Sequence, residues 1–205
     1  MDGSTAPALT RRGRGPDNRA AQRGPTWGRD AIDRPRRTPV NEALVSHDGP
    51  GHHWLAARGH RGMELGLQRI GALLRRLGDP QSAVPVVAVA GSDGKGSTSA
   101  MLASLFQASG LHVAHYASPH LVETRERVAI DGMAVSAEVL DAALLQVAEA
   151  ARAEPALDPT PFEALTAAAL LVFAAATPSL DVAVLEVGLG GRLDAVNASE
   201  PVVSV

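Results

Sequence analysis

The segment VVAVAGSDGKGST, residues 86–98, decides the fold class of this chain. It begins with an apolar, β-branched run typical of a buried strand, passes through a glycine-rich turn and continues into a helix-forming stretch from Ser97. In such a strand–loop–helix unit, glycines let backbone N–H groups converge on an anion, and the start of the helix adds partial positive charge. The segment therefore predicts a phosphate-binding loop. The alternative is an ordinary glycine-rich turn.

Lys95 is the only lysine in the 205-residue chain, all other basic side chains being arginine. A lysine at this place supplies a point charge for the β- and γ-phosphates of a nucleotide, and a following hydroxyl, that of Ser97, can bind Mg²⁺. The match to the general phosphate-loop pattern is imperfect. Gly96 separates the lysine from Ser97, and no glycine lies five residues before Gly94.

The remaining pattern predicts strands that alternate with helices. Helices are expected at 63–77, 97–109, 136–152 and 161–176, and strands at 86–90, 111–116, 127–132, 180–187 and 201–205. This alternation indicates an α/β fold with a three-layer parallel sheet. Ligands of such sheets bind beyond the carboxyl ends of the strands. Three candidate pieces fall at such ends: the 91–97 loop, Ser118 and Glu186.

Glu186 and Ser118 are candidate metal ligands. Glu186 ends an apolar strand, and an acid at the end of a strand beside a phosphate loop is placed to hold Mg²⁺ directly or through water. The alternative is a carboxylate that faces solvent. Ser118 follows the second strand, although a Ser-Pro pair alone is more commonly a turn. The glycines after Glu186 do not form a dinucleotide fingerprint, because Leu193 occupies the place of the third glycine.

Composition excludes several classes of protein. The chain has no cysteine, so it has neither disulfides nor thiolate metal sites. No apolar stretch approaches the length of a membrane span, and the first residues lack the order of a secretory signal. We therefore expect a cytoplasmic protein without a membrane or nucleic-acid partner.

Charge divides the chain into two parts. Residues 1–40 hold nine arginines and four aspartates, a formal charge of +5, whereas residues 41–205 carry −8. The first part is rich in glycine and proline and is expected to be a disordered basic tail. The alternatives are a segment that contacts nucleic acid or a targeting segment. Residues 41–205 are expected to form the folded domain.

Five ordered motifs give the chain a resemblance to a known family. They are Leu65-Gly66-Leu67 with Arg69-Ile70; Gly91 to Thr98; Ser118-Pro119-His120-Leu121 with Glu126-Arg127-Val128; Phe162-Glu163; and Leu185 to Ala195 with Asn197. Together they resemble the N-terminal ATPase domain of folylpolyglutamate synthase/dihydrofolate synthase, a branch of the Mur ligase superfamily. The resemblance covers roughly residues 63–205. It implies a fold like the central domain of Mur ligases, incomplete at its C-terminus.

The resemblance also implies the roles of particular residues. ATP would be bound by Gly91, Ser92, Asp93, Gly94, Lys95, Gly96 and Ser97, with Lys95 acting in catalysis. Mg²⁺ would be bound by Ser118, Glu186 and Ser97. The pterin substrate would be bound by Glu64, Leu65, Gly66, Thr160, Pro161, Phe162, Glu163, Leu193, Asp194 and Ala195. The family usually has Thr-Asn where this chain has Ser92-Asp93, and Asp93 places a negative charge near the phosphates.

The reaction implied by the resemblance is ATP-dependent amide formation in folate biosynthesis. The γ-phosphate passes to a carboxylate of dihydropteroate or folate, and the amine of glutamate attacks the resulting acyl phosphate. The family acts as a monomer and has a C-terminal domain with no counterpart in these residues, so we expect the 205-residue chain to be inactive alone. The alternatives are a nucleotide-binding remnant without catalysis and a Mur-type ligase that acts on a cell-wall precursor.

Overall fold

The computed structural model describes residues 49–59 and 64–205, which all belong to one compact unit. The helices are α1 (Pro50–Ala56), α2 (Gln68–Arg76), α3 (Lys95–Ala108), α4 (Ala137–Arg152) and α5 (Pro161–Ala174), with the 3₁₀ turns η1 (Pro80–Ser82), η2 (Thr124–Arg127) and η3 (Ala195–Ser199). The strands are β1 (Val86–Val89), β2 (Val113–Tyr116), β3 (Val128–Ile130), β4 (Met133–Ala134), β5 (Val182–Glu186) and β6 (Val203–Ser204). The tail predicted at residues 1–40 lies outside the described residues.

The described strands form one sheet in the order β4-β3-β2-β5-β1-β6. Strands β2, β5, β1 and β6 are parallel, which confirms the predicted α/β fold class. At one edge the sheet is antiparallel: β3 pairs antiparallel with both β2 and β4. The reason is local. Asp131 and Gly132 connect the two strands with φ values of 49° and 75°, and a two-residue turn of this kind joins only antiparallel neighbours.

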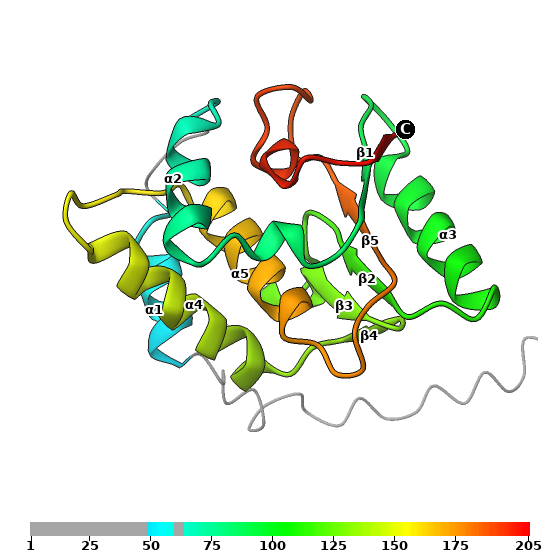
Figure 1. The fold of residues 1–205 in the computed structure, drawn as a ribbon, viewed down its shortest axis with the longest axis horizontal. Helices are drawn as coiled ribbons and strands as arrows, with labels where there is room; N and C mark the ends of the chain where they lie inside the picture. The colour runs from blue at the N-terminus through cyan, green and yellow to red at the C-terminus, as the bar shows by residue number, and fades with distance from the viewer. Residues whose placement is uncertain (1–48, 60–63) are drawn as a thin grey trace, which may run out of the picture. The chain divides into compact units, whose positions relative to one another are not determined.

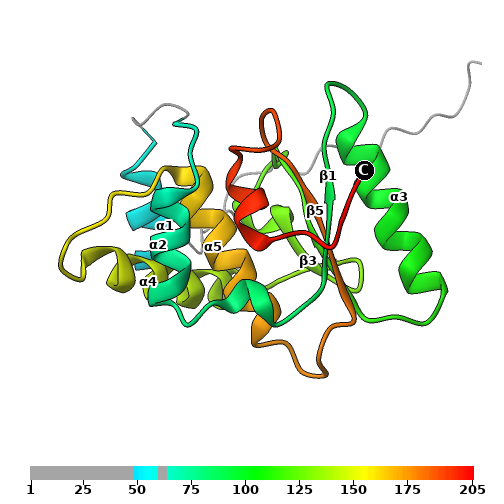
Figure 2. The same ribbon diagram turned by 45° about the horizontal axis from the view of Figure 1, so that its top comes forward.

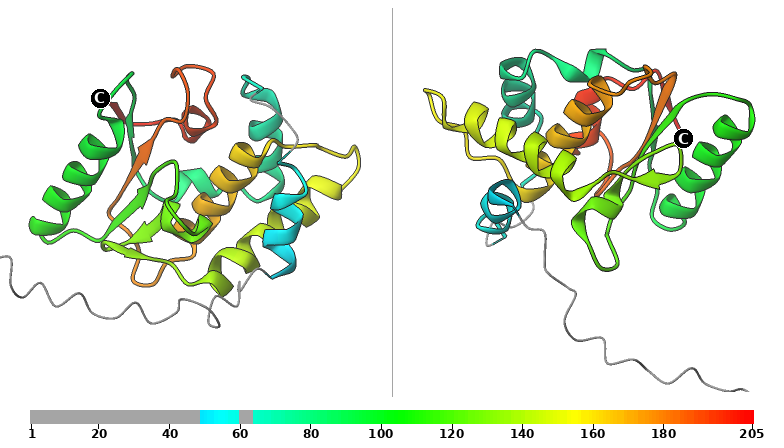
Figure 3. Two further views of the ribbon diagram at one scale, coloured as in Figure 1. Left: turned by 180° about the vertical axis from the view of Figure 1, so that it is seen from behind. Right: turned by 90° about the horizontal axis from the view of Figure 1, so that it is seen from below.

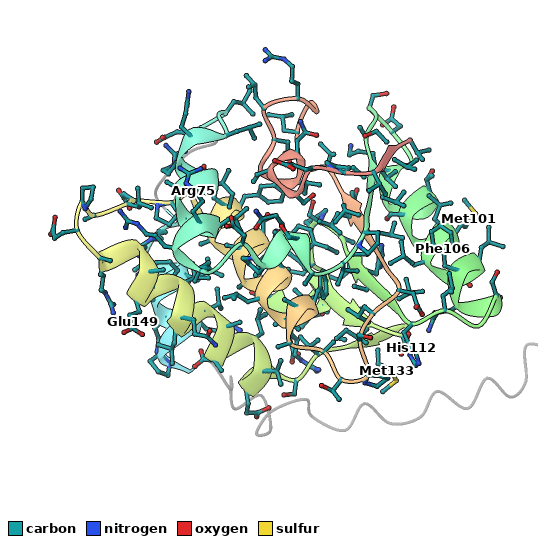
Figure 4. All side chains as sticks on the ribbon, viewed as in Figure 1. Arg75, Met101, Phe106, His112, Met133 and Glu149 are labelled. Atoms are coloured by element: carbon teal, nitrogen blue, oxygen red, sulfur yellow. The ribbon has the colours of Figure 1, made fainter. Side chains whose placement is uncertain are left out.

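Helices cover the two faces of the sheet unequally. Helices α1, α2, α4 and α5 gather on one face, and α3 covers the other (Figures 1 and 3). The larger core is built mainly from Ala, Val and Leu side chains of the four helices and the sheet. The smaller core joins α3 to β1, β2 and β5, with Phe106 packed against it while Met101 points to solvent at 60% exposure (Figure 4). Within the described residues, no helix is long and apolar enough to cross a membrane.

Two helices begin at other residues than the pattern predicts. Helix α2 begins at Gln68 and not near Met63, because Gly66 has a φ of 146° and its N–H donates to the carbonyl of Leu193 at 3.1 Å. Helix α3 begins at Lys95, two residues earlier than expected, because Gly94 takes the left-handed conformation at the N-cap. Both differences place candidate site residues outside or at the very start of a helix.

The carboxyl ends of β1, β2 and β5 lie at one edge of the sheet because the three strands are parallel neighbours. The connection from β1 to α3 and the connection after β5 both rise from this edge (Figure 2). The fold therefore collects the glycine-rich segments of the sequence in one place.

Candidate active site

The phosphate-loop segment forms a tight turn between β1 and α3. Gly91 and Gly94 have φ values of 150° and 74°, conformations that strongly favour glycine. Lys95 is the first residue of α3, and its ammonium donates to the carbonyls of Gly91 at 3.0 Å and Ser92 at 3.2 Å. An ammonium has three donors, so the lysine can fasten the loop and still offer an N–H to an anion.

Glu186 lies directly beside this loop. It is the last residue of β5, it pairs in register with Val89 of β1, and it is only 4% exposed. A Cβ built on Gly96 would lie 3.6 Å from both carboxylate oxygens, so the first turn of α3 passes over this carboxylate. The backbone N–H of Ser118 donates to Glu186 Oε2 at 2.9 Å. The structure thus brings together the loop, Glu186 and Ser118, as the sequence predicts.

The donors present at this edge fit a magnesium ion. They comprise one buried carboxylate, Glu186, and the hydroxyls of Ser97 in the first turn of α3 and Ser118 after β2. No group of three or more His, Cys, Asp or Glu side chains suited to a metal occurs in the part of the chain that the structure describes. A site with one carboxylate and otherwise hydroxyl, water and phosphate oxygens is the usual arrangement for Mg²⁺, which keeps several waters.

A cavity of about 330 Å³ is lined in part by Ser118, whose N–H contacts this carboxylate. It is lined by Glu64, Leu65, Gly66, Ser118, Pro119, Arg127, Thr160, Pro161, Phe162, Glu163, Gly188, Leu189, Leu193, Asp194 and Ala195. All ten residues of the predicted pterin site are among them. Since Ser118 both lines the cavity and contacts Glu186, and Glu186 lies beside Gly96, this residue links the cavity to the carboxylate under the phosphate loop.

The start of α5 places Phe162 in the cavity wall. Thr160 and Glu163 form a capping box, the Thr160 hydroxyl accepting from the Glu163 N–H while Glu163 Oε2 accepts from the Thr160 N–H at 2.7 Å. The Phe162 ring packs against the Tyr116 ring in a tilted arrangement, with ring centroids 6.1 Å apart. Gly188 lies under the same ring: a Cβ there would stand 2.7 Å from a ring carbon. The glycine therefore makes room for the aromatic wall.

Glu163 is a buried carboxylate with unequal oxygens. It is 2% exposed, and its Oε2 accepts from Arg69 Nε at 2.7 Å. Arg69 also donates to Glu64 at 2.8 Å, and its hydrogen bond to Glu163 raises the pKa of the guanidinium. Oε1 of Glu163 has no hydrogen-bond partner among the described residues. A buried acceptor without a donor is costly, so this oxygen is suited to a ligand N–H.

Asp194 holds the opposite wall through backbone contacts. Its two oxygens accept from the N–H groups of Leu189 and Val196, each at 2.9 Å, and it caps η3. Burial raises the pKa of Asp194, and these N–H donors oppose the rise. The carboxylate therefore fixes the glycine-rich turn after β5.

The segment from Ser118 to Arg127 forms a third side of the cavity. Glu126 accepts from the N–H groups of Leu121, Val122 and Glu123, and these backbone donors lower its pKa. Arg127 donates to His120 Nδ1 at 2.8 Å and lines the cavity. Leu121 is 93% exposed, so the tip of the segment presents an apolar side chain to solvent.

Sequence reasoning missed four residues of the cavity wall and one residue that supports the wall. They are Pro119, Arg127, Gly188 and Leu189, which line the cavity, and Arg69, which holds Glu163. The motifs contained all five, but a motif does not say which of its members face a ligand. The small size of Gly188 was the available signal.

The chain is similar in sequence to several known proteins. No protein-family model matches the chain. A probable bifunctional folylpolyglutamate synthase/dihydropteroate synthase of Haloferax volcanii is 49% identical over 144 residues, 68% of this chain and 17% of that protein. The dihydrofolate synthase/folylpolyglutamate synthase of Bacillus subtilis is 37% identical over 155 residues, 74% of this chain and 36% of that protein.

Solved structures agree with the sequence relatives. E. coli FolC in complex with DHPP and ADP has a TM-score of 0.69 and 38% identity over 76% of this chain and 37% of that one. A folylpolyglutamate synthase/dihydrofolate synthase with Mn, AMPPNP and L-glutamate bound has a TM-score of 0.68, 38% identity and the same coverage. The described domain is thus a Mur-ligase-like nucleotide-binding fold.

Within that class, the sequence relatives and the solved structures consistently belong to one family. The resemblance to folylpolyglutamate synthase/dihydrofolate synthase is confirmed over about 70% of the chain. The chain spans between 17% and 37% of the length of the relatives and solved structures described above.

Proposed function

We propose that residues 41–205 form the nucleotide-binding part of an ATP-dependent ligase that adds glutamate to dihydropteroate or folate through an acyl phosphate. The observation that carries this proposal is the position of Ser118. Its N–H donates to Glu186 beside the phosphate loop, and the same residue lines the 330 Å³ cavity. A carboxylate ligand in the cavity and a γ-phosphate at the loop would therefore meet at one edge of the sheet. Holding two reactants in this way lowers the entropic cost of their reaction.

The phosphate side of the site would be formed by Gly91 to Ser97. The backbone N–H groups at the start of α3 have no helical acceptor and are available to phosphate oxygens. Lys95 adds the charge, and Ser97, Ser118 and Glu186 would hold Mg²⁺. Bound magnesium neutralises charge on the β- and γ-phosphates.

The cavity suits a flat heterocycle with N–H groups on its edge. The Phe162 ring and the backbone of Gly188 provide a flat apolar wall. Oε1 of Glu163 provides a buried acceptor to which no residue in the described part of the chain donates. A pterin has both a flat ring system and an edge of N–H donors, which supports a pterin substrate over a sugar-linked peptide.

The test is a set of titrations on the purified 205-residue chain. We expect Mg·ATP and dihydropteroate each to bind with a stoichiometry of one, and the two ligands together with added glutamate to give no glutamylated product with the isolated chain. Binding of a uridine-diphosphate-linked peptide in place of dihydropteroate would support the cell-wall ligase instead. Binding of Mg·ATP without any pterin would support the nucleotide-binding remnant.

We also propose that the protein works in the cytoplasm as a monomer, with small-molecule substrates only. Light scattering coupled to size-exclusion chromatography tests the oligomeric state, and cell fractionation tests the location. A stable dimer in the micromolar range would contradict the first part, and recovery with membranes the second.

A further inference from the structure

His115 is a polar residue on an apolar face of the sheet. The face toward α3 is built from valines, among them Val113 beside it on β2 and Val184 opposite it on β5. Burial lowers the pKa of His115, although the Glu186 carboxylate opposes this effect. The side chain is therefore a neutral imidazole at neutral pH. His115 is partly buried, and a polar group with restricted access to water gains from a hydrogen-bond partner; the proposed chemistry does not use this imidazole.

The partner is Ser99, in the first turns of α3. Its hydroxyl is fully buried and donates to the carbonyl of Gly96 at 3.0 Å. His115 Nε2 lies 3.0 Å from the same oxygen. A serine hydroxyl has one hydrogen, and the Gly96 carbonyl can only accept it. His115 must then donate through Nε2–H, and the two bonds form a continuous path from β2 to the backbone of Gly96.

This path ends beside the candidate metal ligand. Gly96 passes over Glu186, with 3.6 Å from its would-be Cβ to each carboxylate oxygen. Glu186 is held in turn by the N–H of Ser118, three residues after His115 on the same segment. The segment formed by β2 and the residues just after it thus contacts both the first turn of α3, through His115, and the Glu186 carboxylate beneath that turn, through Ser118.

We propose that His115 and Ser99 are positioning residues that hold the first turn of α3, and with it the phosphate loop, in place over Glu186. The proposal rests on the proposed function for its consequence, nucleotide affinity. The path of two hydrogen bonds from His115 through Ser99 to Gly96, called the relay below, is a property of the folded chain and does not depend on that function. Helix α3 is held on the sheet by a small apolar cluster, so the hydrogen bond from His115 to Ser99 has a large share in fixing its N-terminal end on the sheet, and the bond from Ser99 to Gly96 within the helix extends that restraint to the first turn.

The experiment compares variants that remove each bond with variants that keep it. His115→Val removes the imidazole but suits a strand and the valine cluster. His115→Gln keeps an amide N–H close to the place of Nε2–H. Ser99→Ala removes the hydroxyl, and Ser99→Thr keeps it. His112→Val is the matched control, because His112 precedes the same strand at its other end and contacts Asp131 there.

The first readout is hydrogen exchange of the Thr98 and Ser99 amides by NMR, without nucleotide. A neutral hydrogen bond contributes enough to change a local opening about 3- to 10-fold. We expect exchange to be faster by this factor in His115→Val and Ser99→Ala, with wild-type rates in His115→Gln and Ser99→Thr. Amides of α5 should keep their rates in every variant, whereas general destabilisation would raise them too.

The second readout is the dissociation constant of Mg·ADP by calorimetry, for which we expect the same 3- to 10-fold weakening and the same rescue. The double variant Ser99→Ala/His115→Val should bind no more weakly than the weaker single variant, since both belong to one path. Exchange within twofold of wild type in His115→Val, or no rescue by glutamine, would overturn the proposal. If wild type binds no nucleotide, the proposed function fails while the exchange data still decide the relay.

Discussion

The backbone N–H of Ser118 and Oε2 of Glu186 are 2.9 Å apart, and this contact joins the nucleotide edge of the sheet to the neighbouring cavity. A change of Glu186 should therefore act on metal-dependent nucleotide binding. We expect Glu186→Gln to weaken Mg·ATP binding at least about 10-fold and to leave metal-free binding unchanged, because an amide is a poor ligand for a hard cation. Calorimetry with and without Mg²⁺ measures this. Glu149→Gln, on the exposed face of α4 (Figure 4), is the control. An equal loss in both conditions would argue against a metal role.

The lone lysine should distinguish triphosphates from monophosphates. Lys95→Ala removes a charged hydrogen bond to the β- and γ-phosphates, which contributes about 1.5–3 kcal/mol. We expect ATP to bind about 10- to 150-fold more weakly and AMP to be little affected. Arg75→Ala, which removes an exposed cation of α2 (Figure 4), should change neither affinity. A loss of equal size for AMP and ATP would show that Lys95 acts only on the loop's own carbonyls.

Gly188 should control the cavity and not the nucleotide. Gly188→Ala puts a Cβ 2.7 Å from a carbon of the Phe162 ring, so the ring must move into the cavity. We expect dihydropteroate to bind about 2- to 10-fold more weakly, the range of a lost aromatic contact, with ADP binding retained. Gly191→Ala, whose added Cβ meets no atom within 4 Å, is the matched control. Equal pterin affinity in the two variants would be evidence against Phe162 as a wall of the site.

Asp93 should weaken nucleotide binding slightly. It is exposed in the phosphate loop, so its repulsion of phosphates is screened by water. We expect Asp93→Asn to bind ADP about 2- to 5-fold more tightly at low salt, with the difference vanishing at high salt. Dissociation constants measured across a salt series provide the check. Weaker binding by the asparagine variant would mean that the carboxylate organises the loop.

The pair of His112 and Asp131 should make stability depend on pH. His112 lies at the end of the sheet opposite the phosphate loop (Figure 4), with Nδ1 3.0 Å from Asp131 Oδ2. The hydrogen bond to Asp131 raises the pKa of His112, and the bond from His112 lowers the pKa of Asp131. Because the pKa of His112 is higher in the folded state, the histidine contributes its full stabilisation below its unfolded-state pKa. This stabilisation is lost as pH rises through its folded-state pKa. Because the pKa of Asp131 is lower in the folded state, the aspartate contributes its full stabilisation above its unfolded-state pKa. This stabilisation is lost as pH falls through its folded-state pKa.

The contribution of this pair is therefore greatest between the two unfolded pKa values, about 3.9 and 6.5. We expect the thermal midpoint of His112→Gln to fall below that of wild type near about pH 5.5, with the gap closing at about pH 8 and at high salt. A gap of the same size at both pH values would indicate packing and not charge.

The sequence predicted the site better than it predicted the contacts that hold it. The order of residues in 86–98 and 180–187 was enough to place the loop and Glu186 at one edge, because parallel strands share their carboxyl edge. The start of α2 was misplaced, since the left-handed glycine at position 66 follows from a bond to Leu193, which is remote in sequence. Local periodicity does not contain this information.

Side-chain partners were equally out of reach. Arg69 and Glu163 are 94 positions apart, and their ion pair exists only because α2 and α5 pack on the same face. His115 and Ser99 are 16 positions apart and meet only when α3 lies on β2. Each pair needs the tertiary arrangement before either residue has a recognisable role.

One NMR experiment tests the central claim most directly: amide shifts of the 205-residue chain titrated with Mg·ADP and, separately, with dihydropteroate. The account predicts two adjacent footprints. The nucleotide should perturb residues 91–97, the pterin should perturb 64–66, 160–163 and 188–195, and both should perturb Ser118. A nucleotide footprint away from the 91–97 loop, or two footprints that do not meet at Ser118, would contradict it.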